Sequence, residues 1–245
     1  MKDFDPADSF GPRVAASYDQ DSHRGDEDAA ADFLAALAGS GGALEFAIGT
    51  GRIALPLAQR GVSVDGIELS EDMVTRLRQK PGGDALTVTI GDMSTVEMPE
   101  RYRLVYLVFN TIFNLLTEDD QVRCFENAAR HLDDGGAFVV ETALPHAWIR
   151  PDQSDYVHLD KIEQDEVGFA VARYDPVTQL LTENHVRLTE AGNTFKPIVC
   201  RLITPGEMDL MARIAGLRLI ERLGSWRREP FGHASQGHGS VYGKR

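Results

Sequence analysis

The sequence predicts an α/β fold: a doubly wound, mostly parallel, seven-stranded sheet with an antiparallel β insertion before its closing helix and last strands. Two observations lead to this prediction. Up to Pro145, short apolar runs alternate with amphipathic stretches, as in parallel sheets that helices cover on both faces. After Pro145 the pattern changes to strand-like runs separated by turns, which is typical of an antiparallel meander.

The elements of the first part follow in a regular order. Apolar residues recur at helical spacing over residues 26–38, and the glycine-rich run GSGG at 39–42 ends that helix. The expected strands are 43–48, 62–68, 86–90, 104–109 and 135–142. Between them we expect helices at 52–59 and 71–79, and a third helix that Thr117 caps.

The second part contains the insertion and the closing elements. Residues 166–203 predict three strands joined by the turns DPVT (175–178) and EAGN (190–193). Thr204 and Glu207 then bracket a proline, which predicts a capped helix. The last strands are expected near 217–226 and 238–243. Residues 26–245 are therefore expected to form a single domain in which 150–203 is a β-rich lid or substrate insertion.

Composition limits the classes of function. The chain has 245 residues and a net charge of −13, which disfavours a nucleic-acid partner because phosphate binding needs a basic surface. Its two cysteines, Cys124 and Cys200, lack zinc-site spacing, and we expect no metal and a reducing cytoplasmic location. The N-terminus lacks a secretory apolar region, and no apolar run approaches the roughly 18 residues of a membrane span.

The stretch ALEFAIGTGR (43–52) carries the first functional signal. A strand that runs into GTGRIA matches the glycine pattern of nucleotide-binding folds. By itself this pattern is equally compatible with an ordinary tight turn. Two carboxylates and a short motif on neighbouring strands strengthen the interpretation of this turn as a ligand-binding site.

The carboxylates are Glu68 and Glu45. Glu68 ends the second expected strand, where a carboxylate can accept hydrogen bonds from both ribose hydroxyls; the alternative is an acid that favours the start of the next helix. Glu45 would repel a pyrophosphate on the glycine turn but attract an ammonium group and a sulfonium. The alternative for Glu45 is a surface acid at a strand edge.

The third signal is the run Gly91-Asp92-Met93, directly after the third expected strand. An aspartate at this point can accept a hydrogen bond from an adenine amino group. By itself the run is also a turn with a helix cap.

In order and spacing, these motifs and the segment LVFNTIFNLLTEDDQVRCFENAARHLDDGGAFVVE resemble the class I S-adenosylmethionine-dependent methyltransferases. The resemblance covers roughly residues 15–145 and is closest to small actinobacterial-type enzymes with a Rossmann-like fold that act on small molecules. It implies S-adenosylmethionine as cofactor and S-adenosylhomocysteine as product. The family usually carries glycine where this chain has Ala47. The residues that the resemblance places around the cofactor are Tyr18, Glu45, Ala47, Gly49, Gly51, Glu68, Leu69, Met73, Gly91, Asp92, Met93, Phe109, Asn110 and Thr111.

The resemblance implies methyl transfer to an O, N or C atom of a small organic metabolite. Residues 1–25, including Tyr18, are expected to close over the cofactor. One alternative is a nicotinamide-dependent oxidoreductase, and another is a non-methylating S-adenosylmethionine-binding module of the same fold. The sequence leaves open the acceptor, the atom methylated, the oligomeric state and whether the N-terminal segment is ordered without ligand.

The catalytic residues remain unassigned, because an activated methyl donor needs a general base only for some acceptors. The candidates are Tyr18 and His146, which follows the fifth expected strand, although His146 also fits a loop position. We expect His233 and His238 to be solvent-facing loop residues, and His185 to lie on a meander strand. Aromatic residues that could line an acceptor pocket are Trp148, Tyr156, Phe169, Tyr174, Phe195, Trp226 and Phe231.

Overall fold

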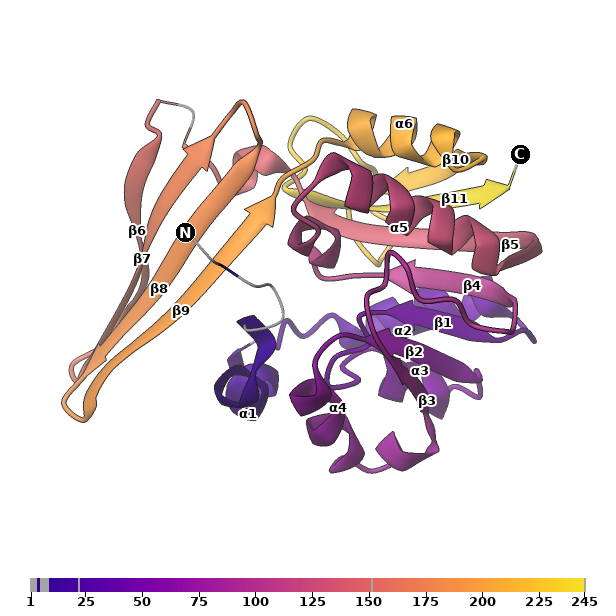
Figure 1. The fold of residues 1–245 in the computed structure, drawn as a ribbon, viewed down its shortest axis with the longest axis horizontal. Helices are drawn as coiled ribbons and strands as arrows, with labels where there is room; N and C mark the ends of the chain where they lie inside the picture. Colours follow the sequence, from indigo (N-terminus) through magenta and orange to yellow (C-terminus); the bar gives the residue numbers. More distant parts are fainter. Residues whose placement is uncertain (1–3, 5–8, 22, 151, 245) are drawn as a thin grey trace.

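The computed structural model describes residue 4 and residues 9–21, 23–150 and 152–244. These residues form a seven-stranded sheet covered by helices and a four-stranded sheet beside it (Figure 1). The seven strands have the order β10-β11-β5-β4-β1-β2-β3. They are β1 (Ala43–Phe46), β2 (Val64–Glu68), β3 (Thr87–Ile90), β4 (Tyr102–Leu107), β5 (Leu132–Ala143), β10 (Leu217–Leu223) and β11 (Gly237–Lys244).

The predicted doubly wound and mostly parallel sheet is confirmed. β1 pairs in parallel with β2 and β4, and the pairs β2–β3 and β4–β5 are parallel too. β11 pairs antiparallel with both β5 and β10, so among the described strands of this sheet β11 alone runs opposite to the others. All four residues of β1 are buried, because a central parallel strand is covered on both faces.

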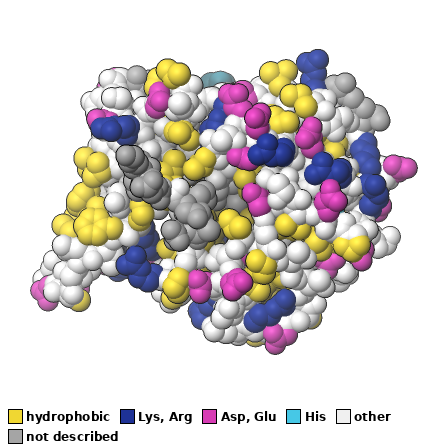
Figure 2. Space-filling view, viewed as in Figure 1, with side chains coloured by type: hydrophobic (Ala, Val, Ile, Leu, Met, Phe, Trp, Pro, Cys, Tyr) yellow, Lys and Arg dark blue, Asp and Glu magenta, His cyan; other side chains and the backbone are white. Residues whose placement is uncertain are grey.

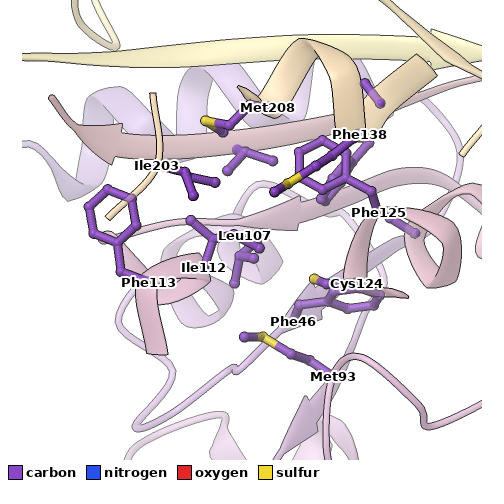
Figure 3. Packing of buried hydrophobic residues seen from close by; sticks show 14 of the residues in the cluster. Phe46, Met93, Leu107, Ile112, Phe113, Cys124, Phe125, Phe138, Ile203 and Met208 are labelled. Carbon is purple, nitrogen blue, oxygen red and sulfur yellow. The ribbon is translucent and has the colours of Figure 1, made fainter. Parts of the chain in front are cut away.

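Each face of this sheet carries its own hydrophobic core. On one face, helices α5 (Glu118–His131) and α6 (Pro205–Ile214) pack through residues such as Phe125 and Met208 (Figure 3). The rings of Phe125 and Phe138 meet edge to face, with centroids 5.2 Å apart. On the other face, α2 (Glu27–Ala38) and α3 (Ala54–Gln59) cover β1 and β4. The two layers hold the strand ends in fixed positions.

Side-chain caps define where three of the helices begin. Ser70 accepts a hydrogen bond from the Met73 amide at the start of α4 (Glu71–Arg78). Thr117 caps α5, and Thr204 and Glu207 form the predicted reciprocal capping box of α6. These caps satisfy amides that would lack partners in the first helical turn.

The four-stranded sheet is the insertion, with the order β6-β7-β8-β9. Its antiparallel strands are β6 (Asp155–Ile162), β7 (Glu166–Asp175), β8 (Leu180–Thr189) and β9 (Gly192–Arg201). The last three and their turns match the prediction of three strands, but β6 is an additional strand that the prediction missed. Leu181 and Cys200 join one core of the main sheet, so this sheet is packed against the body.

The N-terminal segment contains helix α1 (Pro12–Asp21), although the sequence is weakly patterned there. The helix lies between the body and the four-stranded sheet (Figure 1). Residues 1–3, 5–8 and 22 of the predicted closing segment lie outside the described residues. No helix in the described part of the chain is long and apolar enough to span a membrane.

Candidate active site

A cavity of about 570 Å³ opens where β1, β2, β3 and β4 end. This is the edge at which open parallel sheets bind ligands, and the volume suits a small organic molecule. Most of the residues predicted to bind a cofactor line it. They are Tyr18, Ala47, Gly49, Glu68, Leu69, Met73, Gly91, Asp92, Met93, Phe109, Asn110 and Thr111.

The glycine turn after β1 forms one wall of the cavity. Ala47, Gly49 and Gly51 all have positive φ angles, of 54°, 57° and 77°, so the alanine in place of the usual glycine adopts a left-handed conformation. Gly51 is not on the cavity wall. A Cβ atom there would lie 2.4 Å from Leu77 Cδ1. Gly51 therefore permits packing behind the turn.

Glu68 connects this turn to the next helix. Its two carboxylate oxygens accept hydrogen bonds from the backbone amides of Gly49 and Ser70, each at 2.8 Å. The side chain is 6% exposed, and burial raises its pKa despite these hydrogen bonds. Glu68 thus accepts a hydrogen bond from the amide of the helix cap Ser70 and also lines the cavity. Its position is compatible with both roles considered from the sequence, ribose binding and support of the start of the next helix.

Glu45 lies behind the cavity wall. It is buried, and the Tyr106 hydroxyl donates a 2.9 Å hydrogen bond to its carboxylate. Burial raises the pKa of Glu45 to about 8, although the Tyr106 hydrogen bond acts in the opposite direction. Close to neutral pH this acid therefore holds its proton.

The segment after β4 is held in an unusual conformation. Phe109 and Asn110 have φ angles of 61° and 63°, which cost energy in residues other than glycine and are frequent at functional sites. The backbone amide of Phe109 donates to the Glu141 carboxylate at 2.5 Å, and the amide of Asn110 donates to the Glu141 carbonyl at 3.1 Å. Arg52 lies over the Phe109 ring, 4.3 Å from its centroid.

Helix α1 borders the cavity through Tyr18, whose ring is 6.5 Å from that of Phe109. Asp19 anchors the helix by accepting hydrogen bonds from Thr50 at 2.6 Å and Lys80 at 2.7 Å. Burial raises the pKa of Asp19, but these hydrogen bonds outweigh it, and the pKa lies below its usual value. Thr50 belongs to the glycine turn, so α1 is fastened directly to the cavity wall. No local pattern in the sequence marks Asp19, because its partners Thr50 and Lys80 are distant in the chain.

Comparison with known proteins identifies this architecture. Residues 43–136 match the family described as a methyltransferase domain. The structure is similar to that of the CcbJ methyltransferase from Streptomyces caelestis, with 35% sequence identity, a TM-score of 0.92, and coverage of 98% of this chain and 99% of that chain. This chain belongs to the class I S-adenosylmethionine-dependent methyltransferases.

Two curated relatives extend the comparison. Cypemycin N-terminal methyltransferase of a Streptomyces species is 24% identical over 190 residues, which cover 77% of each chain. The dTDP-3-amino-3,4,6-trideoxy-alpha-D-glucopyranose N,N-dimethyltransferase of Streptomyces venezuelae is 31% identical over 132 residues, 53% of this chain and 52% of the relative. The cofactor is S-adenosylmethionine, and the alternatives of a nicotinamide oxidoreductase and a non-methylating module are set aside.

The cavity residues of this methyltransferase fit that cofactor. The glycine turn and the buried Glu68 meet at one wall, and Met73 contributes an apolar side chain beside them. Asp92 accepts a 2.7 Å hydrogen bond from the Ser94 amide and still faces the cavity. The wall thus offers carboxylates for hydroxyl and amino groups and an apolar surface for a base.

The histidines of the methyltransferase lie elsewhere. His146 is exposed and does not line the cavity. His233 is exposed as expected, but the expectation of a solvent-facing His238 is wrong, because β11 buries it beside β5, with its ring 3.2 Å from Thr142 Oγ1 and 2.8 Å from Ser240 Oγ. Burial lowers the pKa of His238 to about 4.

His185 lies on β8, as expected, but in a cluster that the sequence analysis missed. Asp160 lies 2.9 Å from His185 Nδ1 and 3.3 Å from His158 Nε2. The carboxylate of Glu183, 3.7 Å from His185 Nε2, and the hydrogen-bonded carboxylate of Asp160 raise the pKa of His185 to about 9. His158 and Asp160 are two residues apart on β6, and His158 lies in the same cross-strand row as His185, so alternation along the strands brings all three to one face of the sheet.

Proposed function

We propose that this methyltransferase transfers the methyl group of S-adenosylmethionine to an amine nitrogen of a small organic molecule. The observation that carries the proposal is the wall of the cavity toward the four-stranded sheet, which consists of Asn114, Trp148, Ile198 and Cys200. Among the described residues, no histidine lines the cavity. A neutral amine has its own lone pair for attack, whereas a phenol or alcohol gains from a general base.

Of the other groups that line the cavity, Asp120 is held in an ion pair with Arg123, and the thiol of this wall is a poor base. Burial raises the pKa of Cys200 to about 12, so its thiol stays protonated. Glu68 and Asp92 lie at the ends of β2 and β3, on the side proposed for the cofactor. S-Adenosylmethionine supplies an activated methyl group, and the chain's own residues need only align the acceptor and exclude water. One curated relative is named as an N-terminal methyltransferase and the other as an N,N-dimethyltransferase of an amino sugar, and both names support an amine acceptor.

A second cavity suggests where the rest of the acceptor binds. It has a volume of about 630 Å³ and shares Trp148, Ile198 and Cys200 with the first. Its far side carries Glu183 and His185 of the four-stranded sheet. An acceptor whose amine lies in the first cavity can therefore extend over Trp148 toward polar groups. This arrangement favours a molecule with hydrogen-bonding substituents several bonds away from its amine.

The same arrangement supports a role for the flanking parts. We propose that residues 1–25 close over the cofactor through α1 and Tyr18. Residues 26–245 would then form the methyltransferase domain, with 150–203 as the lid that bounds the acceptor cavity. The contacts of Asp19 with the glycine turn support this assignment.

The test pairs acceptors that differ only in the reacting atom, for example amino sugars and the matching hydroxyl sugars, and measures S-adenosylhomocysteine and the methylated product. We expect methylated amines and unreacted alcohols. The pH at which kcat/KM reaches its plateau should follow the pKa of each amine, because the acceptor supplies the titrating group. Methylation of the hydroxyl compounds, or one fixed plateau for all amines, would contradict the proposal.

Trp148→Ala tests the acceptor cavity separately. We expect a higher KM for the acceptor and an unchanged Kd for S-adenosylhomocysteine, because Trp148 lies where the cavities join. Trp226→Ala, which removes the second tryptophan of the chain, is the matched control, because Trp226 lines neither of these two cavities. An unchanged acceptor KM in Trp148→Ala would exclude acceptor binding over this side chain.

A further inference from the structure

The four-stranded sheet has an unusual distribution of polar side chains. Its inner face, which lines the second cavity, carries His158, Glu183 and His185. Because side chains alternate along a strand, the intervening residues form the opposite face, here called the outer face. Its cross-strand rows contain Ile162, Val167, Leu188 and Asn193; Leu159, Phe169, Val186 and Phe195; Val157, Val171, Asn184 and Pro197; and Asp155, Arg173, Thr182 and Val199.

The outer face is apolar and lies open to solvent. Seven of its large hydrophobic residues are 38% to 70% exposed, from Val167 and Leu188 at the lower limit to Ile162 at the upper. Figure 2 shows hydrophobic side chains gathered at the left of the molecule, over this sheet. An antiparallel sheet normally turns its polar face to water, so this exposure indicates a surface that another molecule covers.

The size of the face suits a stable protein interface. Strands of 8 to 10 residues, with about 3.3 Å per residue and about 4.8 Å between strands, give an area on the order of 600 Å². A standard interface buries about 800 Å² on each partner. The outer face alone therefore provides most of the area that a stable dimer needs, and its rims can supply the remainder.

Charge favours a second copy of this chain as the occupant. Each chain carries a net charge of −13, so two copies repel one another over most surfaces. In the rows of the outer face the charged side chains are Asp155 and Arg173, which form an ion pair with each other at 2.6 Å. The face is thus neutral, and it lacks the positive or negative patch that would select an oppositely charged partner.

Asn184 lies in the middle strands of the face, paired with Val171 and Pro197. Its Oδ1 atom is buried and accepts no hydrogen bond from any described residue. The side chain as a whole is half-buried, so Asn184 adds a polar group without charge to the outer face.

We propose that the methyltransferase is a homodimer in which the outer faces of the two four-stranded sheets pack against each other about a two-fold axis. The proposal concerns assembly and does not depend on the identity of the acceptor. Sheet-on-sheet packing of this kind buries interdigitating apolar side chains as in a β-sandwich. It also places the two acceptor cavities on opposite sides of a shared layer.

Sedimentation velocity of the full chain at 1 to 50 µM, chosen as a range on the order of typical dimer affinities, tests the proposal. We expect a species of twice the 27.0 kDa chain mass. The variant Leu159→Lys/Val171→Lys places two cations in the interface and should weaken the dimer at least about 100-fold. The matched control is Leu210→Lys/Ile214→Lys, on equally exposed positions of α6, which should remain a dimer.

All four substituted residues are solvent-exposed in the single chain, so both variants should fold and bind S-adenosylhomocysteine with the wild-type Kd. Each variant gains two positive charges. A difference in dimer affinity between the two variants is therefore due to the positions of the lysines. A monomeric wild type, or a face variant that dimerises as tightly as the control, would overturn the proposal.

Discussion

The hydroxyl of Tyr106 donates a hydrogen bond to the carboxylate of Glu45 across two neighbouring strands, with a distance of 2.9 Å. The pair is fully enclosed between the glycine turn and the core. Because the pKa of Glu45 is raised to about 8, folding stabilises its protonated form. This relationship links the pH dependence of stability to the strand that carries the glycine turn.

Glu45→Gln should remove part of the pH dependence of unfolding. Between the ordinary glutamate pKa of about 4.5 and about 8, the folded protein binds more protons than the unfolded chain, so stability decreases as pH rises. The wild type should lose about 1.4 kcal/mol per unit of pKa difference over this window, and glutamine should lose none of it. Urea unfolding at pH 5, 6.5 and 8 measures both slopes. Equal slopes would show that Glu45 ionises freely.

His238→Gln should change the pH dependence in the opposite direction. The pKa of His238 is lowered to about 4 in the folded protein, from about 6.5 in the unfolded chain. The unfolded chain therefore binds more protons between these values, and stability falls as the pH decreases from 6.5 to 4. The variant should lack this acid-dependent loss in the same urea experiment. His233→Gln is the control, because His233 is exposed and its replacement should leave the slope unchanged.

Glu68→Ala should weaken cofactor binding by about 1.5–3 kcal/mol, the contribution of hydrogen bonds to a charged group. The substitution also removes the hydrogen-bond acceptor of the Gly49 and Ser70 amides. Because this loosens the glycine turn, it should also weaken cofactor binding. Calorimetric titration with S-adenosylhomocysteine measures it. The control is Glu71→Ala, in the first turn of the same helix α4 but exposed. An unchanged Kd in Glu68→Ala would remove Glu68 from the cofactor site.

Gly51→Ala should destabilise the fold more than Gly61→Ala. Both glycines have positive φ angles, of 77° and 84°, and alanine costs roughly 1–2 kcal/mol in this conformation. At Gly51 the new methyl group also meets Leu77 at 2.4 Å, whereas nothing lies within 4 Å at Gly61. Thermal unfolding should show a further loss of about 1–3 kcal/mol for Gly51→Ala. A smaller loss at Gly51 than at Gly61 would contradict the packing role.

The sequence predicted the elements whose signals are local. The capping box of Thr204 and Glu207 depends on residues three positions apart, and the structure contains it. The strands of the parallel sheet are short apolar runs because burial on both faces leaves no room for alternation. Glu68 and Asp92 were predicted from their positions at the ends of two expected strands, and Phe109 from the family resemblance; the structure brings all three to one cavity.

The features that the sequence did not predict share one physical cause. Each of them depends on parts of the chain that are distant in sequence. β6 was missed because the bulge between Leu159 and Lys161 interrupts its alternation. His238 lies in a glycine-rich run, and only pairing with Thr142 of β5 buries it. Helix α1 has Ala15 as its buried residue, and the contacts that position it come from Thr50 and Lys80.

Helix α1 contacts both the glycine turn and the four-stranded sheet. Asp19 fastens it to the glycine turn, and Asp21 forms an ion pair with Lys196 of β9, the edge strand of the sheet that bounds the acceptor cavity. If α1 covers the bound cofactor as proposed, release of the spent cofactor must loosen the acceptor cavity at the same time. We therefore expect ordered kinetics, in which the methyl donor binds before the acceptor and S-adenosylhomocysteine leaves after the methylated product.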